Sequence, residues 1–176
     1  MHYERSLWPL IASRTTHYDT YFNYCAGMTE LIDLTPFNGS WELFEYDSDN
    51  LEEWMKAMNI PWAKRKIGKS LKRTFTFEVD AANPKTNFRV KSVTKVTNKD
   101  VQVVIDQPQD DVSVEGRKMK SVFTVQNGNL VNVDRWQDDK GNDKSGSYTF
   151  VFESATVLMV KMEYSGKLVH QKYKKV

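Results

Sequence analysis

The chain has 176 residues and a formal net charge of +2, from 25 lysines and arginines against 23 aspartates and glutamates. This length suits one domain with a sizeable core, and the near balance of charge gives no indication of a nucleic-acid partner. Apolar residues make up 40% of the chain and aromatic residues 12%, which excludes wholesale disorder and fibrous repeats. Because Cys25 is the only cysteine, a disulfide-stapled secreted scaffold is excluded and a reducing compartment is expected. No apolar run approaches the ~20 residues that cross a bilayer, so we expect a soluble protein.

Residues 1–34 are predicted to form a poorly ordered N-terminal extension, because their aromatic residues follow neither a helical nor a strand period. Their one apolar patch is short and broken by a proline, unlike a secretory signal. Glu4 and Asp19 interrupt the acid-poor pattern of a mitochondrial transit peptide, although that interpretation stays open, and Met28 is an alternative start. The functional domain is therefore expected at residues 35–176.

Two short helices are predicted near the start of this domain. The first has apolar residues at helical spacing, namely Leu51, Trp54, Met55 and Met58. Pro61 follows, a residue that starts helices better than it continues them, and residues 63–71 form the second helix. The pair forms a helix–turn–helix in which nothing indicates DNA binding.

The rest of the domain reads as a strand array. Strands are expected at residues 41–46, 74–79, 88–96, 101–105, 111–114, 118–125, 130–136, 148–152, 157–164 and 167–173. Turn residues separate them at 83–84, 98–100, 115–116, 127–128, 154–156 and 165–166, with a polar loop at 137–145. Such short connections predict an antiparallel meander, since parallel strands need long crossovers. A barrel is favoured over an open sheet, which would expose sticky edges.

Several inward positions of this barrel are polar, which is unusual for a packed core. Ser92 and Thr94 share one face of a strand, as do Gln171 and Tyr173 near the C-terminus. Since a barrel of this size is too wide for its own side chains to fill, a mixed lining indicates a cavity with water and one small ligand. The alternative is that these residues face solvent and the assumed strand parity is off by one.

An ordered set of motifs resembles the intracellular lipid-binding proteins, which include the fatty-acid-binding and cellular retinoid-binding proteins. The motifs are Phe37-Asn-Gly-Ser-Trp41, Met55-Lys56, Ala63-Lys64-Arg65-Lys66, Arg117-Lys118-Met119-Lys120-Ser121, the strand from Gly128 to Trp136, and Gln171-Lys172-Tyr173-Lys174-Lys175-Val176. The resemblance implies a mainly β, calycin-like fold: a ten-stranded antiparallel up-and-down barrel that encloses a ligand cavity under a two-helix lid. It also implies a carrier of long-chain fatty acids, retinoids or similar amphipaths, and not an enzyme.

The sequence departs from the resemblance at the expected head-group site. Family members that clamp a carboxylate use two arginines and a tyrosine. Tyr173 matches the tyrosine, but Gln171 replaces one arginine, and the other is absent near Phe150 or Val151. A buried carboxylate there would lack compensation. Gln171 is closer to the retinol-binding branch, so either the head group is neutral or the carboxylate lies elsewhere, near Arg117 or beside a lysine.

Further candidates follow from position. Contacts with the ligand are expected from the lid and the portal, at Leu51, Trp54, Met55, Ile60 and Val96. Glu115 and Asp134 are candidate cavity carboxylates, and a buried Glu115–Arg117 pair is the favoured interpretation. Contact with anionic membranes, or a solvated helix face, is expected of Lys64, Arg65, Lys66 and Lys69.

The sequence therefore predicts a non-enzymatic carrier of a long-chain fatty acid or similar lipid. A retinoid carrier is the alternative, and a barrel that acts through its surface, as an interaction or stress-protective protein, is the alternative of another class. His2, His17 and His170 are too scattered for a metal cage, so neither a metal nor a cofactor is expected. We expect a monomer without a nucleic-acid partner in the cytoplasm, with the nucleus as a further compartment.

Overall fold

The computed structural model describes residues 31–113 and 116–176. The predicted extension lies outside the described residues except for 31–34, and Glu115 lies outside them as well. Leu34, the last residue of that segment, is fully buried, and its backbone N–H donates to the carbonyl of Pro84 at 2.9 Å. This residue therefore packs with the barrel.

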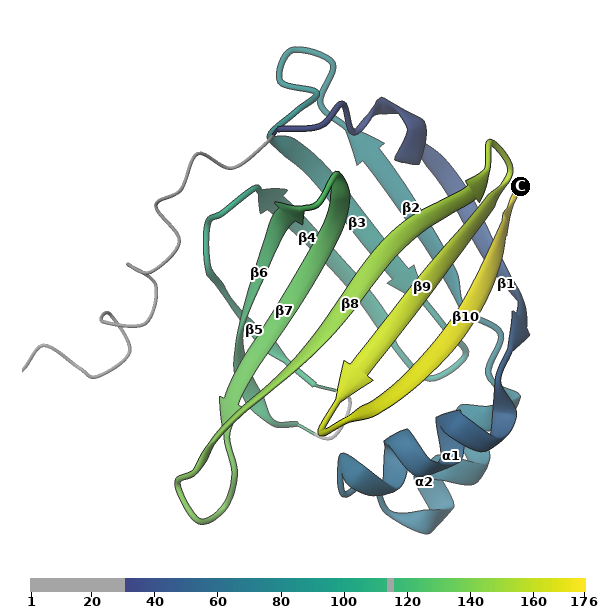
Figure 1. The fold of residues 1–176 in the computed structure, drawn as a ribbon, viewed down its shortest axis with the longest axis vertical. Coiled ribbons are helices and arrows are strands. Elements are labelled where there is room, and N and C mark those ends of the chain that lie inside the picture. Colours follow the sequence, from purple (N-terminus) through teal and green to yellow (C-terminus); the bar gives the residue numbers. More distant parts are fainter. Residues whose placement is uncertain (1–30, 114–115) are drawn as a thin grey trace, which may run out of the picture.

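Ten antiparallel strands form one strongly curled sheet, with two helices at one end (Figure 1). The strands are β1 (Gly39–Tyr46), β2 (Thr74–Val79), β3 (Asn87–Val93), β4 (Asn98–Val104), β5 (Gln109–Val112), β6 (Lys118–Gln126), β7 (Asn129–Gln137), β8 (Asp143–Ser154), β9 (Val157–Tyr164) and β10 (Lys167–Lys175). A 3₁₀ turn at Thr35–Phe37 precedes β1, and α1 (Ser48–Ala57) and α2 (Trp62–Ser70) lie between β1 and β2. The predicted ten-stranded antiparallel architecture with two helices is confirmed.

The two edges of this sheet are β4 and β5. The strand order is β4-β3-β2-β1-β10-β9-β8-β7-β6-β5, so β1 pairs with β10 but no described ladder joins β4 to β5. A side-chain ion pair spans this seam, because the Lys99 ammonium contacts both carboxylate oxygens of Asp111 at 2.8 and 2.9 Å. The backbone N–H of Asp106 also donates to the carbonyl of Phe123 at 2.7 Å. Closure thus depends here on side chains and one loop contact.

Two connections differ from the sequence prediction. Residues 94–97 form the turn between β3 and β4, whereas the first strand was expected to reach 96 and the turn to lie at 98–100. The reason is local: the Thr94 hydroxyl accepts hydrogen bonds from the N–H groups of Val96 and Thr97, at 3.2 and 3.0 Å.

The loop before β8 is also shorter than the polar composition of residues 137–145 indicated, since β8 begins at Asp143. The Asp138 carboxylate accepts from the N–H groups of Lys140 and Asn142, at 3.0 and 2.9 Å, and this closes the turn. The same hydrogen bonding, led by Asn142, lowers the pKa of Asp138 to about 2.

An aromatic core fills the end of the barrel away from the helices. Trp41 near the start of β1 is fully buried, and its indole N–H donates to the carbonyl of Phe37 at 2.7 Å. The rings of Phe37 and Phe77 lie 5.5 Å apart, and those of Phe77 and Phe150 lie 5.9 Å apart, edge to face. Each such pair contributes ~0.5–1.5 kcal/mol beyond the burial of its surface. This end of the barrel is therefore closed by packing, and the cavity lies toward the helices.

The two helices differ in how they are held. Asp47 caps α1, because its carboxylate accepts from the N–H of Asn50 at 3.1 Å, and the predicted apolar stripe buries Leu51, Trp54 and Met55. By contrast, α2 has no buried residue, and Ile67 is 48% exposed. Since burial supplies most of the stability of a short helix, α2 is the more weakly held of the two.

Candidate functional site: a cavity beneath the two helices

A cavity of about 520 Å³ lies between the helices and the inner face of the sheet. This volume falls within the ~300–1,000 Å³ of small-molecule binding sites. Apolar side chains such as Phe75, Phe123 and Met162 form much of its wall, and polar side chains gather on β4 to β7. The cavity therefore suits a mostly aliphatic molecule that carries a small number of polar groups.

Most of the predicted ligand-binding residues line this cavity. They are Leu51, Trp54, Met55, Ile60, Val96, Arg117, Asp134, Phe150 and Gln171. Val151 does not line it: since alternate residues of a strand face opposite sides, the inward position of Phe150 turns Val151 outward. Glu115 lies outside the described residues, and so does its expected pairing with Arg117.

Tyr173 and Gln171 form a buried polar pair on β10. The Tyr173 hydroxyl donates to Oε1 of Gln171 at 2.7 Å, and 0% of Tyr173 and 4% of Gln171 is exposed. Gln171 lines the cavity, whereas Tyr173 lies behind it against the ring of Phe75, 5.0 Å between centroids. Because the carbonyl oxygen of Gln171 is occupied, its NH₂ group is the part that remains to bind a ligand.

Arg73 is a cation at this site that the sequence prediction missed. It precedes β2 and lines the cavity together with Gln171, and both also line a side pocket of about 20 Å³. Burial raises the pKa of the Tyr173 phenol, and Arg73 acts in the opposite direction through its charge and a hydrogen bond. Only the strand pairing reveals that Arg73 lies near Gln171, since β1 alone separates β2 from β10 in the sheet. An arginine from the segment before β2 therefore lies beside Gln171 in the cavity lining.

A second polar cluster lies on the opposite wall. The Asn132 amide donates to the Ser121 hydroxyl at 2.7 Å, and Asp134 lies two residues further along β7. Burial raises the pKa of Asp134 to about 6, although Ser121 acts to lower it by hydrogen bonding. The expected carboxylate pair of Glu115 and Asp134 falls outside the described residues, because Glu115 is not among them. The charge of Asp111 also raises the pKa of Asp134.

Arg117 connects the barrel wall to the lid. Its guanidinium stacks over the ring of Trp136, 5.0 Å from the centroid, and donates to the carbonyl of Met58 at 3.3 Å. Met58 is the C-cap residue that directly follows α1. Arg117 therefore holds the turn between the two helices against the sheet.

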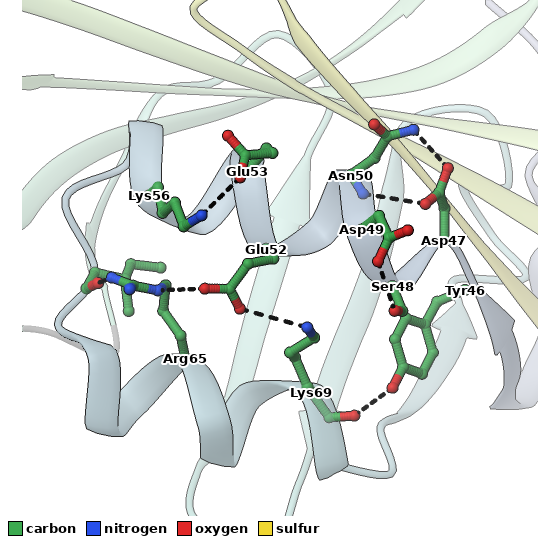
Figure 2. Close-up of polar contacts among 11 residues, drawn as sticks. Tyr46, Asp47, Ser48, Asp49, Asn50, Glu52, Glu53, Lys56, Arg65 and Lys69 are labelled. Atoms are coloured by element: carbon green, nitrogen blue, oxygen red, sulfur yellow. Dashed lines mark hydrogen bonds and ion pairs between the residues drawn. The ribbon is translucent and has the colours of Figure 1, made fainter.

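Ion pairs join the two lid helices to each other (Figure 2). Glu52 of α1 contacts Arg65 at 2.9 Å and Lys69 at 3.5 Å, and these cations lower the pKa of its carboxyl. The Tyr46 hydroxyl donates to the carbonyl of Lys69 at 2.5 Å. The predicted membrane-contact set is therefore divided: Lys64 and Lys66 are exposed, whereas the Arg65 side chain is 17% exposed and engaged by Glu52.

The described residues contain neither a metal-binding cluster nor a membrane-spanning helix. No group of three or more His, Cys, Asp or Glu side chains in residues 31–113 and 116–176 is arranged to hold a metal ion. No helix in those same ranges is long and apolar enough to cross a membrane.

Comparison with known proteins relates this chain to fatty acid-binding proteins. No protein-family model matches the chain. The liver fatty acid-binding protein of Lethenteron camtschaticum is 32% identical over 91 residues, which cover 52% of this chain and 76% of that protein. Fatty acid-binding protein 9 of Homo sapiens is 27% identical over 103 residues, 58% of this chain and 74% of that protein. A Schistosoma mansoni fatty acid binding protein, solved in complex with arachidonic acid, has a TM-score of 0.70 at 19% identity over 82% of this chain and 99% of that one, which shows the fold.

A curled ten-stranded sheet with an internal cavity beneath a helix pair defines a calycin-like β-barrel. The 32% identity over three quarters of the Lethenteron protein adds the family. The chain belongs to the intracellular lipid-binding proteins, the family of the fatty acid-binding proteins, and the resemblance found in the sequence motifs is confirmed.

Proposed function

We propose that the protein is a non-enzymatic carrier that holds one long-chain fatty acid, or a lipid of similar length, and moves it through the cytosol. The observation that carries this proposal is the largely apolar cavity of about 520 Å³ beneath the two helices, in a chain related to fatty acid-binding proteins. Each buried methylene contributes ~0.8 kcal/mol, so a long chain gains on the order of 10 kcal/mol. Lost ligand freedom offsets about 4 kcal/mol or more of this gain. The remainder of about 6 kcal/mol corresponds to a Kd of roughly tens of micromolar from the tail alone, and contacts with the head group add to it.

The carboxylate of this ligand binds beside Arg73 and Gln171. Arg73 supplies a charge-assisted hydrogen bond, and the NH₂ group of Gln171 supplies a neutral one. Tyr173 supports the site indirectly, since its hydroxyl holds the carbonyl of Gln171 and so orients the amide. One arginine and one amide compensate a buried carboxylate less fully than two arginines, so selectivity for acids over alcohols is weaker than in a two-arginine clamp.

The ligand leaves beneath the weakly held helix. Because α2 buries no residue, its displacement exposes little apolar surface and opens the portal that Ile60 and Val96 line. Lys64 and Lys66 are exposed on this helix and face anionic membranes during transfer, and Lys69 contributes to the same surface.

Retinol is the second candidate, favoured by the neutral NH₂ donor of Gln171, which suits an alcohol. Native mass spectrometry of the protein isolated from cells tests both ligands, followed by titration of the delipidated protein. Co-purified fatty acid with saturable binding of oleate supports the proposal, and retinol in place of fatty acid supports the second candidate. A protein that binds neither refutes both and favours a role of the barrel surface.

A further inference from the structure

Asp134 is a buried acid whose carboxylate is not fully hydrogen-bonded by the residues around it. Only 7% of the residue is exposed, it lines the cavity, and its Oδ1 has no hydrogen-bond partner among the residues that the structure describes. Buried polar groups are nearly always hydrogen-bonded, and a buried charge without compensation is strongly unfavourable. An aliphatic residue here would remove that penalty, so the acid calls for a reason beyond folding.

The neighbouring strands leave one oxygen of Asp134 open to the cavity wall. In the strand register, Asp134 lies opposite Ser121 on β6 and opposite Gly146 on β8. The Ser121 hydroxyl accepts a hydrogen bond from the Asn132 amide at 2.7 Å, and hydrogen bonding with Ser121 lowers the pKa of Asp134. Gly146 has no side chain and brings no donor from the other side. The chain Asn132–Ser121–Asp134 therefore orients the carboxyl and satisfies it in part.

The charged groups around Asp134 do not neutralise it either. They are Lys99 on β4, Asp111 on β5, and Arg117 in the segment before β6. Lys99 contacts both oxygens of Asp111, at 2.8 and 2.9 Å, so that pair is balanced by itself. Arg117 stacks on Trp136 and binds the lid at Met58. Lys99 lowers the pKa of Asp134 through its charge, but burial outweighs this effect, so the charge of Asp134 is only partly compensated.

We propose that Asp134 is a second polar subsite of the cavity, at which Oδ1 accepts a hydrogen bond from a hydroxyl or ammonium group of the ligand. This rests on the proposed function, since the bound molecule is taken to be an aliphatic lipid. Together with Arg73 and Gln171, the subsite gives the cavity two polar poles of different chemistry: one donates to an acid, and the other accepts from an alcohol or amine. The ligand class therefore extends to long-chain alcohols, amines and hydroxylated fatty acids.

Four ligands with one common chain test this subsite: oleylamine, oleyl alcohol, methyl oleate and oleate. Each displaces a fluorescent hydrophobic probe from the delipidated full-length protein and from its Asp134→Asn variant. We expect the variant to bind oleylamine about 10-fold more weakly or worse, the loss of one charge-assisted hydrogen bond. Oleyl alcohol weakens less, and methyl oleate, which has no donor, is unchanged. Oleate is unchanged or binds more tightly, because a negative charge has left the wall.

Asp110→Asn is the matched control, since Asp110 pairs with Lys120 on the outer side of β5 and its side chain is 87% exposed. It removes the same charge and is expected to leave all four affinities unchanged. A pH series adds a second measurement: oleylamine binding to the wild type weakens as pH falls through about 6, where Asp134 takes up a proton, and the Asp134→Asn variant lacks this step. Ser121→Ala removes the donor that lowers the pKa of Asp134, so the step moves to higher pH.

The outcomes separate the inference from the proposed function. Weaker binding of both oleylamine and oleyl alcohol to the Asp134→Asn variant supports the subsite. Weaker binding of oleylamine alone supports it with ammonium as the bound group. An equal loss for methyl oleate, or no loss for either donor with oleate still bound, overturns the inference and leaves the carrier intact. A wild type that binds none of the four lipids overturns both. Near-UV circular dichroism establishes that each variant is folded.

Discussion

Replacement of Arg73 by leucine tests the head-group site most directly. The guanidinium lines the cavity beside Gln171, where the proposal places the carboxylate of the ligand. Hydrogen bonds to charged groups contribute ~1.5–3 kcal/mol. Because Arg73 is only half-buried, solvent screens the pair and the lower part of that range applies, about 1.5–2 kcal/mol. At about 1.4 kcal/mol per factor of ten, oleate affinity falls about 10- to 30-fold.

The assay is isothermal titration calorimetry of delipidated protein with oleate and with oleyl alcohol. The alcohol shares the chain but carries no charge, so Arg73→Leu is expected to change its affinity by less than about 3-fold, the effect of a weakened neutral hydrogen bond. Lys72→Leu is the matched control, since the neighbouring Lys72 is exposed and outside the cavity lining. It removes the same charge from the same segment.

Two results would refute the reasoning. An equal loss of oleate affinity in Lys72→Leu and Arg73→Leu would show that the overall charge, and not a contact in the cavity, attracts the ligand. A loss for oleyl alcohol as large as that for oleate would show that Arg73 acts through packing over Phe75, whose ring centroid lies 5.9 Å from the guanidinium. Either result would require the carboxylate to bind elsewhere.

Three further predictions concern the core, the lid and the buried acid. Trp41→Ala removes a fully buried ring and is expected to lower the free energy of unfolding by about 3–5 kcal/mol in urea titrations, whereas exposed Phe44→Ala costs about 0.5 kcal/mol or less. Arg117→Ala frees the turn after α1 from its hydrogen bond to Met58; stopped-flow measurements should show ligand release about 5-fold faster, as for the loss of about 1 kcal/mol, and an unchanged rate would contradict the role in the lid. The pKa of Asp134 is raised from 3.8 to about 6, so the folded state holds its proton more tightly and stability falls as pH rises between these values. Asp134→Asn should therefore stabilise the ligand-free protein at pH above 6 by up to about 3 kcal/mol, with the gain vanishing below pH 4, and a gain that does not depend on pH would exclude this cause.

Local chemistry in the sequence predicted much of the fold. Asn127-Gly128 and Ser165-Gly166 were expected as hairpin turns, and all four residues have positive φ, between 50° and 74°, as two-residue hairpins require. The turn at residues 94–97 was misplaced because Thr94 forms it through its hydroxyl, without a glycine or proline to mark it. The apolar lid contacts were also predictable, since the spacing of Leu51, Trp54 and Met55 follows the helical period.

The sequence predicted only some of the polar residues that line the cavity. Gln171 and Asp134 could be assigned inward positions because strand alternation is a local property. The sequence by itself determined that the barrel is too wide to fill and that the expected arginine pair is absent. Only the tertiary structure decided that Arg73 stands beside Gln171 and that Asp134 keeps one oxygen without a partner. The physical reason is that both depend on strand register and on the curling of the sheet. These bring distant segments together and remove water from charged groups, and no local pattern of residues carries that information.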